Sequence, residues 1–260
     1  NLMRDKDELK FAQRNVYGDD QLRLRFAAFW ANHFTIGNTF DTSSMIGHAI
    51  DEGIIANLNG DFANMLYLVT THPGMLTYLD NVWSAGERSP HTKRCRKRPD
   101  CQAGLNDNLG RELLELHTLS PAAGYTEADI RNAAMVLSGW GMDFGASTQD
   151  MLERAKTTNH WQAFKPRYAE PGLKKVFGKT IYAGKNGLKQ LTDYLAGNEY
   201  TIRFISTKLC QHFVSDKPKR TDIAYISEAW RQSNGQLDVI HTAVIERAIA
   251  SDEAKFIWPM

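Results

Sequence analysis

The hydrophobic residues in the N-terminal third of the chain recur at the spacing of an α-helix. One stripe has offsets of 0, 4, 7, 8 and 11 residues and consists of Leu22, Phe26, Phe29, Trp30 and His33. These offsets place side chains on one face of an amphipathic helix, which Asp19 or Asp20 can cap. Proline is absent from the first 72 residues. The same spacing predicts further helices over 43–58 and 61–71, and from Pro73 toward Trp83.

The helical pattern breaks between residues 84 and 104, where prolines, glycines and a run of basic residues follow one another. This composition predicts a long exposed loop. Helical spacing then returns with a leucine stripe at offsets 0, 4, 8 and 11, formed by Leu105, Leu109, Leu113 and Leu116. We expect a helix over 108–119 with Asn106 as its cap.

Thr126 and Asp129 have the spacing of a capping box with Asp in place of Glu, and they begin a helix that stops near Gly139. Between about 141 and 184 the helical signal fades, and aromatic and β-branched residues stand among Gly, Pro and Lys, which predicts a loop with a short β-hairpin. Helices are expected again over 185–196, 200–214, 221–232 and 238–250. The sequence therefore predicts a mainly α, multi-helix single domain over 1–260 with one small β-hairpin insertion. Because residue 1 is Asn1 rather than Met, we expect a fragment of a longer chain.

Composition narrows the protein class. The chain has 260 residues, of which 42% are hydrophobic and 23% charged, as is usual for folded globular proteins. The 31 Lys and Arg nearly balance the 30 Asp and Glu, which argues against a uniformly basic nucleic-acid-binding protein. No run approaches 18 consecutive apolar residues, so no transmembrane segment is expected.

Three cysteines are too few for a disulfide scaffold. Cys95 and Cys101 flank a five-residue loop that could close as a small bridge in an oxidising compartment or stay reduced. A zinc site is the weaker alternative, because the spacing and the missing second ligand pair do not fit one. Cys210 lies in an apolar helical stretch and is expected in the core.

The helix predicted over 108–119 carries unusual acid-base residues. Glu112 lies at the edge of its leucine stripe, while Arg111 and Glu115 lie further round the same flank and His117 follows on the other. In a structural interpretation, Arg111 and Glu115 pair and Glu112 reaches a buried partner. In a functional interpretation, Glu112, His117 and Arg111 are catalytic residues, with Glu112 as general acid/base or metal ligand.

Histidines and acids at helix ends form a candidate metal set, namely His33, Glu112, His72 and Asp80. Imidazoles and carboxylates on facing helices can bind a metal within a bundle, so a divalent metal is the candidate cofactor. The alternative for His33 is a core histidine that is hydrogen-bonded through one ring nitrogen. The sequence has no H-E-x-x-H, no G-x-S-x-G and no P-loop.

The run of basic residues is the strongest local concentration of positive charge in the sequence. It consists of Lys93, Arg94, Arg96, Lys97 and Arg98. Such a run can contact an acidic polymer or simply be solvated. Few aromatic residues lie among these side chains, so base stacking is not supported and no nucleic-acid partner is expected.

Several segments, in order, resemble the bacterial family catalogued as Domain of Unknown Function 1800. The likeness extends from about Leu22 to Ala250. It rests on the segments 29–34, 72–76, 78–81, 105–108, 111–119, 124–129, 137–140, 174–178, 203–205, 208–209 and 213–214.

The resemblance implies a helical bacterial protein made with an export signal, periplasmic or extracellular, and often encoded beside a sulfatase-like partner. It implies no established reaction. The family usually has a His before the acidic residue that precedes Gly-x-Lys, whereas this chain has Ala169 there, before Glu170.

We expect the motif residues to converge on one polar cleft between helices, formed by His33, Asp80, Asn106, Arg111, Glu112 and His117. The main functional hypothesis is a hydrolase-like enzyme, metal-dependent in one version, that acts on an envelope or extracellular polymer. The alternative is a non-enzymatic envelope assembly or binding partner, in which the same polar residues form a satisfied network that specifies helix packing.

Overall fold

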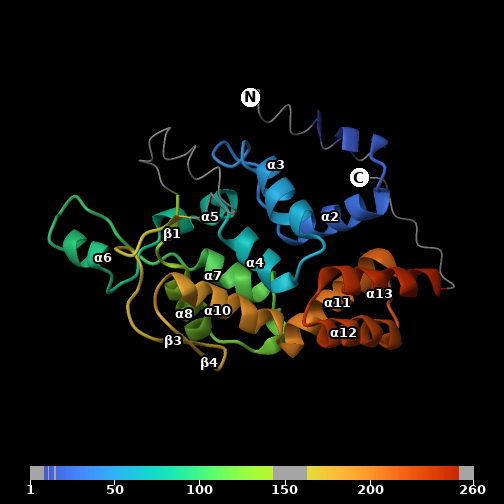
Figure 1. Cartoon of the computed structure of the whole chain (residues 1–260). Helices are drawn as coiled ribbons and strands as arrows, with labels where there is room; N and C mark the ends of the chain where they lie inside the picture. The colour runs from blue at the N-terminus through green and yellow to red at the C-terminus, as the bar shows by residue number, and fades with distance from the viewer. Residues whose placement is uncertain (1–8, 11, 15, 143–162, 252–260) are drawn as a thin grey trace.

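The computed structural model describes residues 9–10, 12–14, 16–142 and 163–251. These residues form a mainly helical protein with two small two-stranded antiparallel sheets (Figure 1). The fold class predicted from the sequence is therefore confirmed. No helix in the described ranges is long and apolar enough to cross a membrane.

The helices occupy most of the lengths expected from hydrophobic spacing. The α-helices are α2 (Gln21–His33), α3 (Ile46–His48), α4 (Phe62–Thr70), α5 (Pro73–Tyr78), α6 (Pro90–Cys95), α7 (Asn108–Glu115), α8 (Glu127–Leu137), α10 (Lys185–Ala196), α11 (Glu199–Phe213), α12 (Arg220–Ser233) and α13 (Leu237–Ile249). A π-helix, η1 (Ala49–Ile54), continues α3, and the 3-10 helices are η2 (Ile55–Asn57), η3 (Asn81–Trp83) and η4 (Pro121–Ala123). The sheets pair β1 (Trp140–Gly141) with β2 (Ala163–Phe164), and β3 (Lys174–Val176) with β4 (Lys179–Ile181).

Local capping chemistry explains where several helices begin. The side chain of Asp20 accepts the backbone N–H of Arg23 at the start of α2, and Asp61 caps α4 in the same way. Thr126 and Asp129 form the predicted capping box at the start of α8, each side chain accepting the other's backbone N–H. Such contacts satisfy N–H groups that have no partner inside the helix.

Helix α2 is central to the core. Trp30 is fully buried and packs against Phe62 of α4, with ring centroids 5.6 Å apart. The Trp30 indole N–H donates to Nε2 of His241 on α13, at 3.0 Å. This contact links segments 211 residues apart and satisfies a polar group that burial would otherwise leave unpaired.

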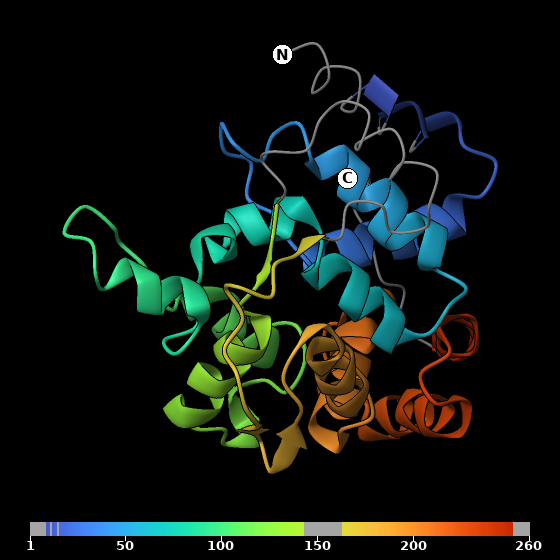
Figure 2. The same ribbon diagram turned by 60° about the vertical axis from the view of Figure 1, so that its left-hand side comes forward.

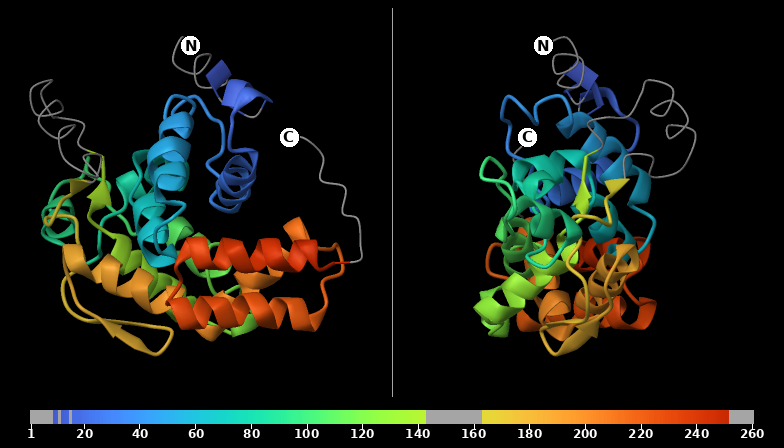
Figure 3. Two further views of the ribbon diagram at one scale, coloured as in Figure 1. Left: turned by 45° about the vertical axis from the view of Figure 1, so that its right-hand side comes forward. Right: turned by 90° about the vertical axis from the view of Figure 1, so that its left-hand side faces the viewer.

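The C-terminal helices α11, α12 and α13 lie side by side (Figure 3). A short β-bridge joins them to the N-terminal half, because the Phe62 N–H donates to the Gly235 carbonyl and the Leu237 N–H donates to the Gly60 carbonyl. The chain turns between α12 and α13 at Asn234 and Gly235, which have φ values of 53° and 83°. Asn and Gly are the residues that adopt this left-handed conformation most readily.

Three expectations about local structure need correction. The segment 84–104 is not a continuous exposed loop, because it contains helix α6. This helix begins with Ser89 as N-cap and Pro90 at its first position. Six residues of the segment are buried, namely Ser84, Ala85, Gly86, Ser89, Thr92 and Cys95. Helix α7 ends at Glu115, so Leu116 leaves the predicted stripe and is 48% exposed. The hairpin β3–β4 lies in the predicted insertion, but β1 and β2 form a second sheet there. The remainder of that insertion, 143–162, is outside the described residues.

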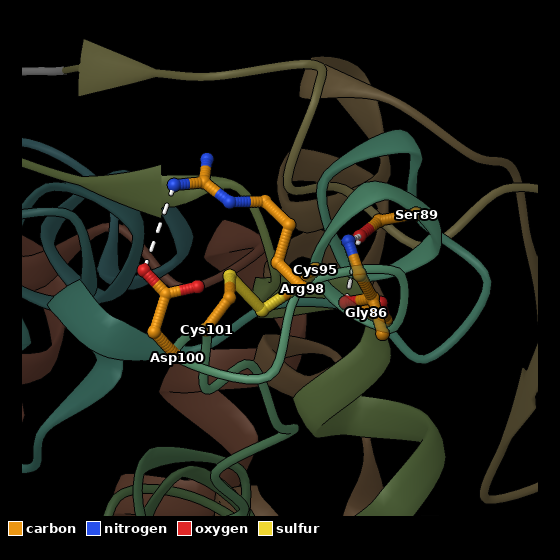
Figure 4. The surroundings of a disulfide bond; sticks show 7 residues. Gly86, Ser89, Cys95, Arg98, Asp100 and Cys101 are labelled. Carbon is orange, nitrogen blue, oxygen red and sulfur yellow. Dashed lines mark hydrogen bonds and ion pairs between the residues drawn. A yellow bond between two sulfur atoms is a disulfide. The ribbon is translucent and has the colours of Figure 1, made fainter.

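Cys95 and Cys101 form a disulfide (Figure 4), which settles the alternative that the sequence left open. The bridge closes the turn after α6, and Figures 1 and 2 show that α6 and this turn lie at the edge of the molecule. Cys210 is buried, as expected. Burial raises the pKa of its thiol to about 12.

Candidate functional site

A buried cluster of three basic side chains joins helix α2, the segment after α7, and α11. Its members are His33, His117 and Lys208. The two imidazole ring centroids are 6.2 Å apart, and the Lys208 ammonium lies 2.9 Å from Nδ1 of His33. His33 and His117 are only 5% and 4% exposed, respectively, while Lys208 is half-buried and connects them to the surface.

The contacts of His33 define its tautomer. Its Nε2 lies 3.2 Å from the backbone carbonyl oxygen of His117. A carbonyl oxygen can only accept, so Nε2 carries the hydrogen of the neutral ring and Nδ1 keeps a lone pair. Nδ1 therefore accepts a hydrogen bond from Lys208, and both ring nitrogens of His33 are engaged.

Burial shapes the acid-base state of all three groups. Desolvation lowers the pKa of His33 well below its usual value, and the nearby Lys208 charge lowers it further. The same two causes, in the same order, lower the pKa of His117 to about 4. Desolvation also lowers the pKa of Lys208. Both imidazoles are therefore neutral near pH 7, beside an amine that is easier to deprotonate than a solvated lysine.

His117 differs from His33 because one of its ring nitrogens, Nδ1, has no hydrogen-bond partner among the described residues. This Nδ1 atom is buried. The ring packs against Phe34, with centroids 5.3 Å apart. An unpaired polar atom in the interior typically destabilises a protein by about 1–3 kcal/mol. A group retained under that cost is a candidate for contact with a ligand.

Glu112, on α7, has a half-buried side chain. Desolvation raises the pKa of its carboxyl group, and the adjacent charge of Glu115 raises it further. Its backbone carbonyl accepts the His117 N–H at 3.0 Å, which places His117 directly after the end of the helix. Within the described part of the chain, the Glu112 carboxylate makes no hydrogen bond and no ion pair.

Arg111 points to a different set of partners. Its guanidinium donates two hydrogen bonds, of 3.0 and 2.9 Å, to the carboxylate of Glu127. The pair expected between Arg111 and Glu115 is therefore replaced by a bidentate contact with α8. Burial raises the pKa of the Tyr125 hydroxyl, and the nearby charge of Glu115 raises it further. Asn106 accepts the backbone N–H of Asn108 at 2.9 Å, but the N-cap position of α7 is Asp107 rather than the predicted Asn106.

The four predicted metal ligands do not form one group in the described residues. His72 is hydrogen-bonded to His48, with Nε2 2.9 Å from Nδ1, and its own Nδ1 accepts the N–H of Gly74. Asp80 is exposed on the turn between α5 and η3. Within the described ranges, one group of three metal-ligating side chains has its ligand atoms within 4.8 Å of one another. This group consists of His91, Cys95 and Cys101. The disulfide occupies both of those sulfur atoms.

The five basic side chains of the predicted polyanion site are all exposed, on α6 and the turn after it. Arg98 lies 3.7 Å from Asp100 within the disulfide-closed turn (Figure 4). The other four exposed basic residues of this set are Lys93, Arg94, Arg96 and Lys97.

The carboxylate of Glu170, which follows Ala169, is held by the neighbouring segment. Its oxygens accept from the backbone N–H and Nε of Arg88, at 2.8 and 2.6 Å. The backbone N–H of Glu170 donates to the Ser138 hydroxyl, and its carbonyl accepts from the Lys174 ammonium. Ala169 itself lies beside Gly139. Glu170 is thus a buried structural anchor with all of its polar groups paired.

The structure thus brings His33 and His117 together, and it gives Asn106, Arg111 and His72 other partners. Sequence reasoning missed Lys208 as a member of the cluster. A signal for it exists: Lys208 lies three residues after Ile205 and one before Leu209, at the edge of the apolar stripe of α11, where a cation is unusual unless it is partnered.

A comparison with known protein families matches residues 2–260 to the family described as Protein of unknown function (DUF1800). No curated protein and no solved structure matches the chain.

Proposed function

The chain belongs to the DUF1800 family, and from that premise we propose that it is an exported hydrolase-like enzyme that acts on an envelope or extracellular polymer. The observation that carries the proposal is the buried Nδ1 atom of His117, which has no hydrogen-bond partner among the described residues, in a cluster with Lys208 and His33. Buried bases with shifted pKa values gather at functional sites more often than elsewhere. Neither the reaction nor the substrate follows from family membership.

The proposed chemistry assigns one role to each side chain. His117, neutral near pH 7 because its pKa is about 4, accepts the proton of an attacking water molecule. The Lys208 ammonium stabilises negative charge that develops on the substrate oxygen, and His33 positions it by accepting its hydrogen bond. Glu112, whose pKa is raised, supplies a proton to the leaving group.

The low pKa of His117 also sets a requirement on the substrate. A base with a pKa near 4 is deprotonated at pH 7 but binds a proton weakly. An anionic group bound near Lys208 would offset the positive charge that lowers the pKa of His117, and would move that pKa toward the range useful in general-base catalysis. The site therefore favours a substrate with a negative charge next to the bond that is broken.

Rates on isolated bacterial envelope polymers and on chromogenic esters, glycosides and sulfate esters test the proposal. We expect Lys208→Met and His117→Leu to lower product release by at least about 100-fold. Lys189→Met is the matched control: Lys189 is an exposed lysine of α10 paired with Asp193, and its loss should leave the rate unchanged. Glu112→Gln should also lower the rate while leaving the melting temperature nearly unchanged, because its carboxylate has no partner to lose.

Equal rates in the wild type and in the two cluster variants would contradict the proposed roles. Absence of turnover on every substrate class, in protein that is folded, would favour the non-enzymatic alternative. In that case the cluster would act in helix packing, and pull-down experiments would take the place of substrate screening.

A further inference from the structure

A second polar site lies on the C-terminal helices, away from the histidine cluster. It is an open groove of about 530 Å³ between α11 and α12. Three of its eight lining residues are arginines and one is glutamate, so the lining carries a net charge of 3 − 1 = +2. The charged residues are Glu199, Arg203, Arg220 and Arg231.

The charges along the groove are unevenly neutralised. Glu199 could pair with Arg203 one turn along α11, but both of its oxygens instead accept from Arg231 of α12, at 2.9 and 2.8 Å. This contact lowers the pKa of the Glu199 carboxyl. Arg203 and Arg220 are exposed, and their guanidinium groups make no hydrogen bond or ion pair with another described residue. Two free guanidinium groups therefore face one groove.

The floor of the groove includes a hydroxyl group. Ser227 lines the groove and is only 3% exposed. A hydroxyl can both donate and accept a hydrogen bond, so it suits contact with an oxygen-rich ligand.

The shape of the groove indicates an elongated ligand. Its lining on α12 extends from Arg220 to Arg231, which is eleven residues or about 16 Å along a helix. Tyr200, at the side of the groove, is 46% exposed and offers a ring face for stacking. Its ring is braced by Phe177, with centroids 6.1 Å apart.

We propose that this groove binds a linear anionic polysaccharide through its carboxylate or sulfate groups. Guanidinium groups bind such planar or tetrahedral oxyanions with paired hydrogen bonds, and an exposed tyrosine ring packs on the apolar face of a sugar. Lys208 lies five residues after Arg203 on α11, about 140° round the helix. The groove is therefore separate from the histidine cluster, and its binding does not depend on the proposed enzymatic function.

Fluorescence anisotropy with end-labelled oligosaccharides tests the proposal on the whole chain. An oligogalacturonate supplies carboxylates, a heparin-derived oligosaccharide supplies sulfates, and dextran is the neutral control. We expect binding to one or both anionic probes and none to dextran. Arg203→Gln combined with Arg220→Gln should weaken that binding at least about tenfold, and Tyr200→Ala should weaken it by a smaller factor.

The matched control removes the same charge from the other basic surface. Arg94→Gln combined with Arg96→Gln also deletes two exposed cations, and it should change the dissociation constant by less than about twofold. All four arginines are exposed, so melting temperatures should be equal to that of the wild type within about 2 °C. Equal losses in the two double variants, a larger loss in the α6 variant, no binding to either anionic probe, or tighter binding to a single-stranded oligonucleotide would overturn the proposal.

Discussion

Two regions of the molecule bury ionisable side chains to nearly the same degree but differ in how completely those side chains are hydrogen-bonded. Glu170 is 2% exposed and His117 is 4% exposed. Every polar group of Glu170 has a partner, on Arg88, Ser138 or Lys174. The Nδ1 atom of His117 has none within the described ranges.

The comparison shows that burial alone does not identify a functional residue. A buried carboxylate that is fully hydrogen-bonded fixes the relative positions of the elements that contact it. Glu170 does this for the segment before α6 and the strand β3, which lie far apart in the chain. A buried imidazole nitrogen without a hydrogen bond contributes no such link, so its retention calls for another reason. Completeness of hydrogen bonding is the feature that separates the two regions.

The largest expected effect is the loss of the Glu170 anchor. Glu170→Ala should destabilise the protein by about 3–4 kcal/mol, because it removes the two hydrogen bonds that the buried carboxylate accepts from Arg88 and leaves the Arg88 backbone N–H without its acceptor. Urea denaturation followed by circular dichroism measures this. The control Glu87→Ala breaks an exposed ion pair with Arg131 and should have an effect of less than about 1 kcal/mol. Equal effects in the two variants would show that Glu170 is not an anchor.

The next effect is a dependence of stability on pH that originates in the histidine cluster. His117 has a pKa of about 4 in the folded protein against an ordinary value of 6.5, so the unfolded chain binds a proton first as the pH falls. Stability should therefore decline from about pH 6.5 downward, and His117 should account for about 3 kcal/mol of that loss by pH 4. Unfolding free energies at several pH values measure the slope. His117→Leu should make it shallower, and an unchanged slope would contradict the shifted pKa.

Local features of the fold were predictable because they depend on neighbouring residues. The capping box of Thr126 and Asp129, the cap of α2 at Asp20 and the spacing of α10 all follow from short-range rules. Helix α6 was missed because a basic, proline-containing sequence is a poor helix signal. Ser89 and Pro90 nevertheless form a favourable start for a helix.

The candidate site was only partly predictable because its contacts are long-range. His33 and Lys208 are 175 residues apart, and no local pattern shows which face of α11 meets α2. Arg111 illustrates the same limit. Its spacing favoured Glu115 on its own helix, but the packing of α7 against α8 offers the better-placed carboxylate of Glu127.

The smallest expected effect compares two buried histidines directly. His241 is 8% exposed, accepts the Trp30 indole N–H and stacks on Phe26 with centroids 3.9 Å apart. His241→Leu should destabilise the protein by about 1–3 kcal/mol at pH 7, because it leaves that indole N–H buried without an acceptor. His117→Leu removes an imidazole whose Nδ1 has no partner, so it should leave stability unchanged or raise it by up to about 1 kcal/mol.

Chemical denaturation of the two variants at pH 7 measures this difference. The neutral form of both histidines predominates at that pH, since their pKa values are about 3 and about 4, and the comparison therefore isolates hydrogen bonding from charge. A destabilisation by His117→Leu as large as that by His241→Leu would mean that the His117 ring stabilises the fold through contacts as complete as those of His241. The reason for assigning it a role in catalysis would then disappear. Stability retained in His117→Leu together with lost activity would leave ligand contact as the explanation for this buried base.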